Sequence, residues 1–531
     1  MSDAVVNEAS PSTDATPDHE VLIVGAGFGG IAAAVALQQV GVTDFVILDK
    51  WGGVGGTWYA NTYPGVQVDI PSMVYSFSFD QRSDWSRVFA PGKDLQRYAE
   101  GVVDRHGLRP KLRLNTLVTG AEWDEQQHYW RVQTEGGAVY TARFVVPAVG
   151  GLEIPKLPDI EGIEAFGGKT MHTANWDHDY DLSGKRVAVI GTGASALQLI
   201  PTIADTVEHL TVFQRRAIWI APKPDWKAGP VTRYLLDRAL FRAPVRAAVG
   251  VAVSAGTGGA FVVGKPVLPV LKVVEAGLKL WMRTQVPDRE LREKLTPNYT
   301  FGCKRPSLSN VYLKTFMRPD VELVTEPIAR GTETGIVTAA GTAREFDVIV
   351  CATGFEVMGK GTTPPFQVFG RNGVELGKFW HENRYSSFQG VSVPNFPNAF
   401  CIVGPYGFAP SSYHSFVEAT AAHAARAIAE ARRRGATVCE VRQEAHDRYT
   451  AKMRARIDRM EYVDMCAGSN TYYINYQGDV AMVRPESQAT MWWQNRHFPF
   501  SAYRFETAAR RIDMAPPVRT MSTAHTEPRA Q

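Results

Sequence analysis

Two stretches of the chain repeat one order of apolar, small and polar residues. Each begins with a short and largely apolar run, at residues 21–24 and 186–190. Such runs are typical of parallel strands that are buried on both faces. A glycine-rich turn, a helix of small apolar residues and a further apolar strand follow each run. This repeated order predicts an α/β protein with two Rossmann-like, doubly wound dinucleotide-binding domains.

The first turn carries Gly25, Gly27 and Gly30 in the spacing GxGxxG. In this pattern the glycines allow a tight turn, the close approach of a pyrophosphate and tight packing of the helix on the strand. The N-terminus of the helix then faces the negative phosphates. The next strand, "DFVILD", ends at Asp49, and an acid there suits the two hydroxyls of an unphosphorylated ribose.

The second turn carries Gly191 and Gly193, with Ala196 completing the GxGxxA variant of the same pattern. We expect Ser195, which lies in this turn, to contact the cofactor as well. This turn therefore predicts a second dinucleotide site.

The charge at the end of the second strand distinguishes the two sites. Asp49 follows Gly25 by 24 positions, and Arg215 follows Gly191 by the same 24 positions, with Arg216 next to it. A carboxylate would repel a 2′-phosphate, whereas a guanidinium can bind it through paired charge-assisted hydrogen bonds. We therefore expect FAD at the first site and NADPH at the second.

Composition narrows the function further. The 531 residues are 45% hydrophobic and 21% charged, as in an ordinary globular protein. The net charge of +3 gives no electrostatic support for a nucleic-acid partner. The residues offer no candidate metal site.

The cysteines are five in number, scattered, and never in a CxxC pair. This predicts a reducing, cytoplasmic compartment and argues against a disulfide framework or a thiol redox centre. Flavin disulfide reductases share the two-cofactor plan but need a cysteine pair beside the flavin. The electron acceptor is therefore expected to be oxygen. The cysteines are Cys303, Cys351, Cys401, Cys439 and Cys466.

The segment 225–296 is basic and rich in apolar residues at helical spacing, and residues 247–264 carry no charge. Glycines within that stretch and the flanking Arg246 and Lys265 argue against a transmembrane span. We expect a buried helical insertion, with a membrane-touching surface as the alternative.

A loop between the two units carries Phe166, Gly168, His172, Trp176 and Asp177 in the order F-x-G-x-x-x-H-x-x-x-W-[P/D]. This order resembles the fingerprint of the Baeyer–Villiger monooxygenases, flavoproteins that convert ketones to esters or lactones. The resemblance implies that the segment links the FAD and NADP domains. It also implies that His172 and Trp176 couple cofactor binding to domain motion.

The segment "GGVGGTWYANTYPGVQVD" resembles a second flavin-contact segment of that family. The resemblance implies cofactor contacts for Gly56, Thr57, Trp58 and Asp69. Gly404, at the end of "PNAFCIVG", resembles part of a loop near the flavin.

The segment "PNYTFGCKRPSLSNVYL" carries the residues with the clearest chemical role. The resemblance implies that Lys304 contacts the NADP phosphate, that Arg305 is catalytic and that Asp69 orients Arg305. Attack on a ketone requires a flavin peroxyanion, and a fixed cation lowers the energy of such an anion. Because arginine stays protonated near neutral pH, it stabilises the anion without quenching it.

These features predict an NADPH- and O2-dependent flavin monooxygenase of ketones that is a monomer or weak oligomer. An N- or S-oxygenating flavin monooxygenase and a non-catalytic redox sensor are the alternatives, and sulfoxidation is a candidate side activity. Tyr472, Tyr473, Trp492 and Trp493 could line a pocket or merely pack. The predicted order is a tail at 1–17, an FAD domain at 18–152, a linker at 153–180, an NADPH domain at 181–375, the rest of the FAD domain at 376–514 and a tail at 515–531.

Overall fold

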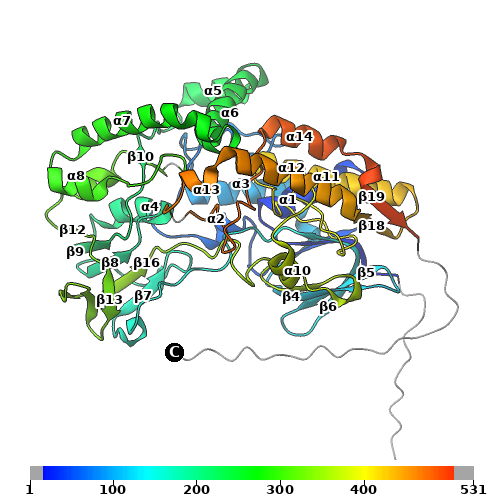
Figure 1. Cartoon of the computed structure of the whole chain (residues 1–531), viewed down its shortest axis with the longest axis horizontal. Helices are drawn as coiled ribbons and strands as arrows, with labels where there is room; N and C mark the ends of the chain where they lie inside the picture. Colours follow the sequence, from blue (N-terminus) through cyan, green and yellow to red (C-terminus); the bar gives the residue numbers. More distant parts are fainter. Residues whose placement is uncertain (1–15, 306, 470, 508–531) are drawn as a thin grey trace, which may run out of the picture.

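The protein is built on two sheets that lie side by side (Figure 1). The computed structural model describes residues 16–305, 307–469 and 471–507. The tails expected at 1–17 and 515–531 lie outside these residues, apart from residues 16 and 17. The prediction of an α/β protein with two dinucleotide-binding units is confirmed.

The first sheet has seven strands in the order β17-β4-β5-β6-β1-β2-β3. Strand β1 lies between β2 and β6 and pairs in parallel with both. Its residues Val21, Leu22 and Ile23 are fully buried, as expected for a central parallel strand. The strands are β1 (His19–Val24), β2 (Phe45–Leu48), β3 (Leu112–Arg113), β4 (Val118–Asp124), β5 (Tyr129–Thr134), β6 (Val139–Pro147) and β17 (Gln367–Phe369).

Helices from both ends of the chain cover this sheet. Ala33 of the N-terminal helix α1 and Ala425 of α11 belong to one hydrophobic core. The first domain is therefore discontinuous, because α11 follows the second sheet in the sequence. The helices around this sheet are α1 (Phe28–Gln39), α2 (Thr57–Ala60), α3 (Gly92–Arg105), α10 (Leu376–Asn383), α11 (Tyr413–Arg433), α12 (Gln443–Met460), α13 (Tyr462–Met465) and α14 (Gln488–His497).

The second sheet has five parallel strands in the order β12-β9-β8-β16-β7. Strand β7 lies within the predicted linker 153–180, yet it pairs with β16 and forms the edge of this sheet. Conversely, β17 lies within the predicted NADPH domain but pairs with β4 of the first sheet. The elements are β7 (Lys169–His172), β8 (Arg186–Ile190), β9 (His209–Phe213), β12 (Val321–Val324), β16 (Val348–Cys351), α4 (Ala194–Ile203) and α9 (Tyr312–Thr315).

Smaller elements complete the chain. The short strands are β10 (Ile220–Ala221), β11 (Ser307–Leu308), β13 (Ile328–Gly331), β14 (Gly335–Thr338), β15 (Ala343–Glu345), β18 (Val438–Val441) and β19 (Tyr503–Glu506). The 3-10 turns are η1 (Arg109–Lys111), η2 (Ile163–Ala165), η3 (Lys265–Val267), η4 (Arg371–Gly373) and η5 (Phe500–Ala502).

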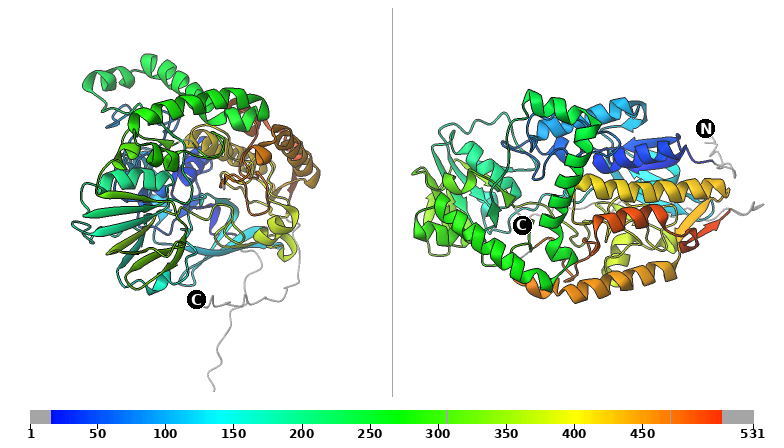
Figure 2. Two further views of the ribbon diagram at one scale, coloured as in Figure 1. Left: turned by 60° about the vertical axis from the view of Figure 1, so that its left-hand side comes forward. Right: turned by 90° about the horizontal axis from the view of Figure 1, so that it is seen from above.

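The segment 225–296 forms the helices α5 (Pro230–Asp237), α6 (Ala239–Val262), α7 (Leu268–Gln285) and α8 (Arg289–Leu295). Seen from above, α6 crosses the middle of the molecule (Figure 2). The expectation of a buried insertion is wrong for α6, because none of its residues 239–256 is buried. This window is the one stretch among the described residues that is long and apolar enough to cross a membrane. The apolar composition predicted burial, but α6 contacts the core along one side only, and composition does not show which side of a helix is covered.

Candidate active site

The glycines of the first turn lie where a side chain would clash with the backbone. Gly25 has φ +110°, and a Cβ atom there would lie 2.6 Å from the carbonyl oxygen of Ala148. A Cβ atom at Gly30 would lie 1.8 Å from the carbonyl oxygen of Gly25. Gly27 meets Gly56 closely, since a Cβ atom on Gly56 would lie 2.9 Å from the Cα atom of Gly27. The two predicted flavin-contact segments therefore cross at these glycines, and only glycine fits the crossing.

Asp49 lies directly behind this turn. It follows β2, is buried, and accepts hydrogen bonds from the backbone N–H groups of Ala26 at 2.5 Å and Trp51 at 2.8 Å. Burial raises the pKa of the Asp49 carboxyl, while the two N–H donors act in the opposite direction. The backbone thus holds this carboxylate at the place where the sequence predicts a ribose.

The segment after Gly56 leads from the turn toward Asp69. Thr57 begins α2, and the indole N–H of Trp58 donates to the hydroxyl oxygen of Tyr75 at 3.1 Å. Burial raises the pKa of Tyr75, and the charges of Asp69 and Arg305 also act on it. Trp58 and Tyr75 therefore connect the first glycine turn to the Asp69 carboxylate.

The second turn repeats the geometry of the first. Gly191 also has φ +110°, and a Cβ atom there would lie 2.6 Å from the carbonyl oxygen of Ala352. Gly193 is open, with no heavy atom of the described residues within 4 Å of its Cβ position. Ser195 lies in the first turn of α4 and interacts with the hydroxyl of Tyr63. Backbone N–H groups at the start of α4 thus face a space suited to a phosphate.

Three cations gather beside this second turn. Burial and, to a smaller degree, the positive charges of Arg216 and Arg215 lower the pKa of Lys304 to about 8. Arg216 also donates a hydrogen bond to the carbonyl oxygen of Gly468. Three like charges repel one another, so an anionic ligand such as a 2′-phosphate would stabilise this arrangement.

Arg305 pairs with Asp69 although 236 positions separate them. The guanidinium Nε lies 2.5 Å from one carboxylate oxygen, and one terminal nitrogen donates to the other at 2.9 Å. This is the bidentate geometry in which a carboxylate fixes the guanidinium plane. Burial lowers the pKa of Arg305, but Asp69, Tyr473 and Tyr472 together raise it more than burial lowers it, so the net change is upward. Arg305 therefore stays cationic.

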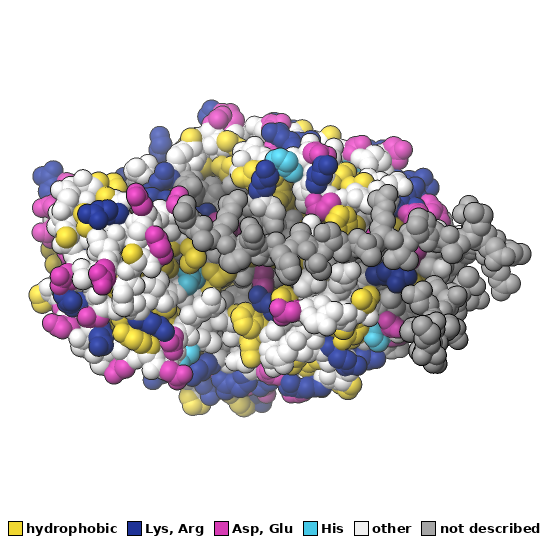
Figure 3. Space-filling model, turned by 90° about the horizontal axis from the view of Figure 1, so that it is seen from below, with side chains coloured by type: hydrophobic (Ala, Val, Ile, Leu, Met, Phe, Trp, Pro, Cys, Tyr) yellow, Lys and Arg dark blue, Asp and Glu magenta, His cyan; other side chains and the backbone are white. Residues whose placement is uncertain are grey.

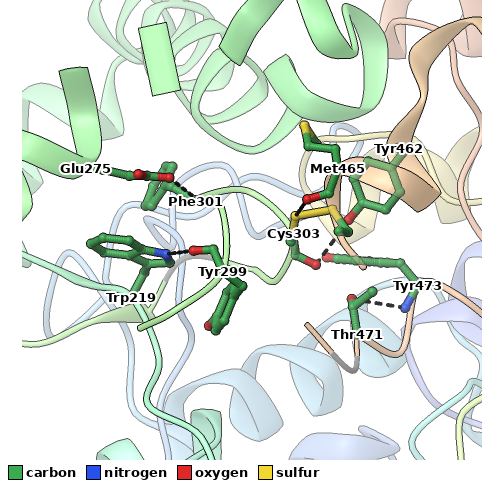
Figure 4. Close-up of a disulfide and its surroundings, with 10 residues drawn as sticks. Trp219, Glu275, Tyr299, Phe301, Cys303, Tyr462, Met465, Thr471 and Tyr473 are labelled. Carbon is green, nitrogen blue, oxygen red and sulfur yellow. Dashed lines mark hydrogen bonds between the residues drawn. A yellow bond between two sulfur atoms is a disulfide. The ribbon is translucent and has the colours of Figure 1, made fainter. Parts of the chain in front are cut away.

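A disulfide ties the Arg305 segment to the second part of the FAD domain (Figure 4). Cys303 is bonded to Cys466, with their Cα atoms 5.3 Å apart and 163 positions between them in sequence. The hydroxyl of Tyr462 donates to the carbonyl oxygen of Cys303 at 3.1 Å. The inference of no disulfide from cysteine spacing is wrong here, because the fold brings together two distant cysteines. Cys351, Cys401 and Cys439 are free.

The two aromatic pairs near the C-terminus lie in different surroundings. Tyr472 and Tyr473 lie together, with their hydroxyl oxygens 3.2 Å apart, and both interact electrostatically with Arg305. Trp492 and Trp493 lie on α14 and are exposed. The tyrosines therefore belong to the surroundings of Arg305, whereas the tryptophans belong to the outer surface.

The fingerprint residues hold the edge of the second sheet. Phe166 is buried, and a Cβ atom on Gly168 would lie 2.5 Å from its ring. Asp177 forms an ion pair with Lys169 at 2.5 Å, and Trp176 packs against the core of the second domain. These contacts explain the spacing of the motif through packing.

His172 ends β7 and is buried. Its Nδ1 atom accepts a hydrogen bond from the N–H of Ala174 at 3.0 Å, so the proton is assigned to Nε2. Burial lowers the pKa of His172, while the backbone of Gly354 and Lys156 raises it. The ring is therefore neutral at pH 7, and its buried Nε2 has no hydrogen-bond partner among the described residues.

Gln67 forms an interdomain contact that the sequence did not reveal. Its backbone carbonyl accepts from the side chain of Gln198 at 2.8 Å, and its side chain accepts from Lys223 at 2.6 Å. Burial lowers the pKa of Lys223 to about 8. Thr62 similarly contacts His178 at 2.8 Å. These contacts join residues 116 and 131 positions apart, so no local pattern could reveal them.

Gly404 lies in a loop with unusual backbone geometry. Its N–H donates to the carbonyl oxygen of Gly390 at 2.8 Å. Its neighbour Val403 has φ +59°, and Tyr406 has φ +59°. Positive φ is strained for a β-branched residue and is typical of functional loops.

The comparisons with known proteins agree with this geometry. Residues 22–254 match the family model described as pyridine nucleotide-disulphide oxidoreductase. The chain is 36% identical over 518 residues to a Baeyer–Villiger monooxygenase of Pseudomonas aeruginosa, covering 95% of this chain and 92% of that one. A cyclohexanone monooxygenase from Rhodococcus bound to NADP+ is similar with TM-score 0.81 and 28% identity, covering 92% of this chain and 99% of that one. A steroid monooxygenase bound to NADP is also similar, with TM-score 0.81 and 30% identity, and the match covers 93% of this chain and 100% of that one.

Proposed function

The chain belongs to the Baeyer–Villiger monooxygenase family, and we propose that it oxidises ketones to esters or lactones with Arg305 as its catalytic cation. It is an FAD-dependent monooxygenase that uses NADPH and O2. The observation that carries the proposed role is the bidentate pair of Arg305 and Asp69, which fixes a permanent cation beside the predicted flavin segment.

The residues present fit both cofactors. The crossing of Gly27 and Gly56 is a cradle that a Cβ atom would fill, and Gly193 opens onto free space. Bound FAD supplies the transfer of electrons from NADPH to oxygen, which no side chain can perform. We propose that Asp49 binds the ribose of FAD and that Lys304 and Arg215 bind the 2′-phosphate of NADPH.

The chemical step requires stabilisation of negative charge on oxygen. The Arg305 guanidinium can hold an anionic oxygen both on the attacking group and on the carbonyl under attack. Asp69 acts as a positioning residue, because two hydrogen bonds keep the guanidinium plane from turning. Arg305 does not release a proton near neutral pH, so it leaves the anion unprotonated.

Product analysis tests the reaction. The holoenzyme is incubated with NADPH, oxygen and a mixed panel of linear, cyclic and aromatic ketones together with aryl sulfides, and the products are identified by mass spectrometry. Esters or lactones carrying one added oxygen atom support the proposal. Sulfoxides without any ester would favour the heteroatom oxygenase instead, and NADPH that is never consumed would favour a redox sensor.

A monomeric or weakly associated state and a cytoplasmic location are part of the same proposal. The need for NADPH supports a cytoplasmic location. The scattered cysteines no longer support it, because Cys303 and Cys466 form a disulfide. Light scattering of the holoenzyme across a range of concentrations tests the oligomeric state.

A further inference from the structure

Helix α6 presents its apolar side to the outside. Leu240 is 79% exposed, Val245 42% and Val251 70%. Val249 and Val253, on the inner side, pack against the core of the first domain. A surface helix of a globular protein ordinarily shows a charged outer face. The outer face of α6 is therefore unusual.

The charged residues of α6 point inward. Arg246 donates to the carbonyl oxygen of Ser76 at 2.7 Å and to its hydroxyl at 2.8 Å. Arg242 donates to the side chain of Gln81 at 3.0 Å. The helix is thus fixed to the FAD domain by polar contacts, while outward apolar residues such as Leu240 and Val251 are exposed among the described residues.

The neighbouring helices extend this surface. On α7, Val270 is 60%, Val273 73% and Leu280 63% exposed, and Trp493 on α14 is 59% exposed. Ser254 of α6 contacts the side chain of Gln488, the first residue of α14, at 3.4 Å. Helices α5, α6, α7 and α14 lie along the top of the molecule in Figure 1 and on the face turned to the viewer in the right-hand view of Figure 2. We call the exposed apolar side chains of these four helices the apolar rim; they include Leu240, Val251, Val270, Val273, Leu280 and Trp493.

Basic residues outnumber acidic residues in the segment that carries most of the apolar rim. Residues 230–283 contain eight Lys and Arg but only two Asp and Glu, a net charge of +6 in a chain whose total is +3. Two of the eight, Arg242 and Arg246, point inward, and the other six remain. Lys272 and Lys279 of α7 and Arg238 beside α6 are exposed. Figure 3 shows the opposite face, where basic and acidic side chains are interspersed. Positive charge and exposed apolar area therefore coincide on one side of the protein.

We propose that the apolar rim docks the enzyme in the plane of an anionic phospholipid bilayer. Apolar side chains enter the boundary between headgroups and acyl chains, and the basic residues bind the lipid phosphates. Exposed tryptophans such as Trp493 suit the headgroup level. Helix α6 lies on the membrane and does not cross it, because a span would break the contacts of Arg242 and Arg246.

A second copy of the chain is a poorer occupant of this surface. A symmetric dimer through the apolar rim would bring two segments of net charge +6 against each other. Like charges across an interface oppose association. An anionic lipid surface supplies both the apolar layer and the opposite charge.

Vesicle flotation tests the proposal with the FAD-loaded full chain. Vesicles of equal parts phosphatidylcholine and phosphatidylglycerol should carry the enzyme at low salt, whereas vesicles of phosphatidylcholine alone should carry much less. The double variant Val251→Asp/Val273→Asp should bind at least tenfold more weakly. Each of Lys272→Gln and Lys279→Gln should weaken binding about fivefold.

Val139→Asp is the matched control, because Val139 is 51% exposed but lies on β6, away from the apolar rim. This variant should float like the wild type, and all variants should keep their FAD content and NADPH consumption. Flotation with neither vesicle, or equal loss in Val139→Asp, would overturn the proposal. So would a dimer that forms without lipid, floats with no vesicle and dissociates in the double variant.

Discussion

Replacing Arg305 with alanine separates the chemical role of the guanidinium from its structural role. The change removes the cation and leaves Asp69 without its bidentate partner. Ester formation should fall ~10²–10³-fold, or roughly 2.7–4 kcal/mol, which is the cost of losing one such electrostatic group. FAD should stay bound, since the glycine turn at 25–30 contains no residue that contacts Arg305.

The effect on stability should be much smaller. The side chains of Arg305 and Asp69 are 28% and 32% exposed, so water can hydrate the carboxylate that remains. Ion pairs with this degree of exposure contribute about 0.2–1 kcal/mol. A small shift of the unfolding midpoint together with a large loss of ester would therefore identify a catalytic role.

The decisive quantity is ester formed per NADPH consumed, because Arg305 could also help to place NADPH. That ratio should fall in Arg305→Ala while hydrogen peroxide accumulates in place of ester. Asp69→Asn should lower the ratio less, because the cation stays, and should add little in the double variant. Arg105→Ala removes a comparable bidentate partner, that of Asp80, and should leave the ratio unchanged. An Arg305→Ala enzyme with wild-type coupling would refute the catalytic role.

The remaining predictions concern the second cofactor, the linker and the disulfide. NADPH should exceed NADH at least tenfold in kcat/KM, or about 1.4 kcal/mol, because Arg215 and Lys304 bind the extra phosphate; equal use of NADH would contradict this. The KM for NADPH should rise as the pH passes about 8, where Lys304 loses its proton and its charge, and Lys304→Arg should abolish the rise. His172→Ala should keep FAD but slow NADPH-dependent turnover, and a variant with full activity would show that His172 only packs. Cys303→Ser should lower the free energy of unfolding by about 2–4 kcal/mol in urea titrations without reductant; the difference from wild type should vanish when reductant is present, and an unchanged midpoint without reductant would refute it.

The sequence by itself determined the fold class and the nature of the two cofactors. The glycines at 25 and 191 can be identified from spacing alone, because a tight turn between a strand and a helix is a local requirement. Both glycines have φ +110°, and a Cβ atom added to either would lie 2.6 Å from the carbonyl oxygen of an alanine. The change from Asp49 to Arg215 is equally local, since each residue ends the strand beside its own turn.

The tertiary structure alone decided which distant residues meet. Arg305 and Asp69 are 236 positions apart, and Cys303 and Cys466 are 163 apart, so no spacing rule predicts either contact from the residues. The family resemblance indicated the first contact, and nothing in the sequence indicated the disulfide. The outward orientation of α6 was equally hidden. An apolar helix has the same composition whether its side chains face a core or the outside, and only the packing of the FAD domain against Arg242 and Arg246 fixes which side is exposed.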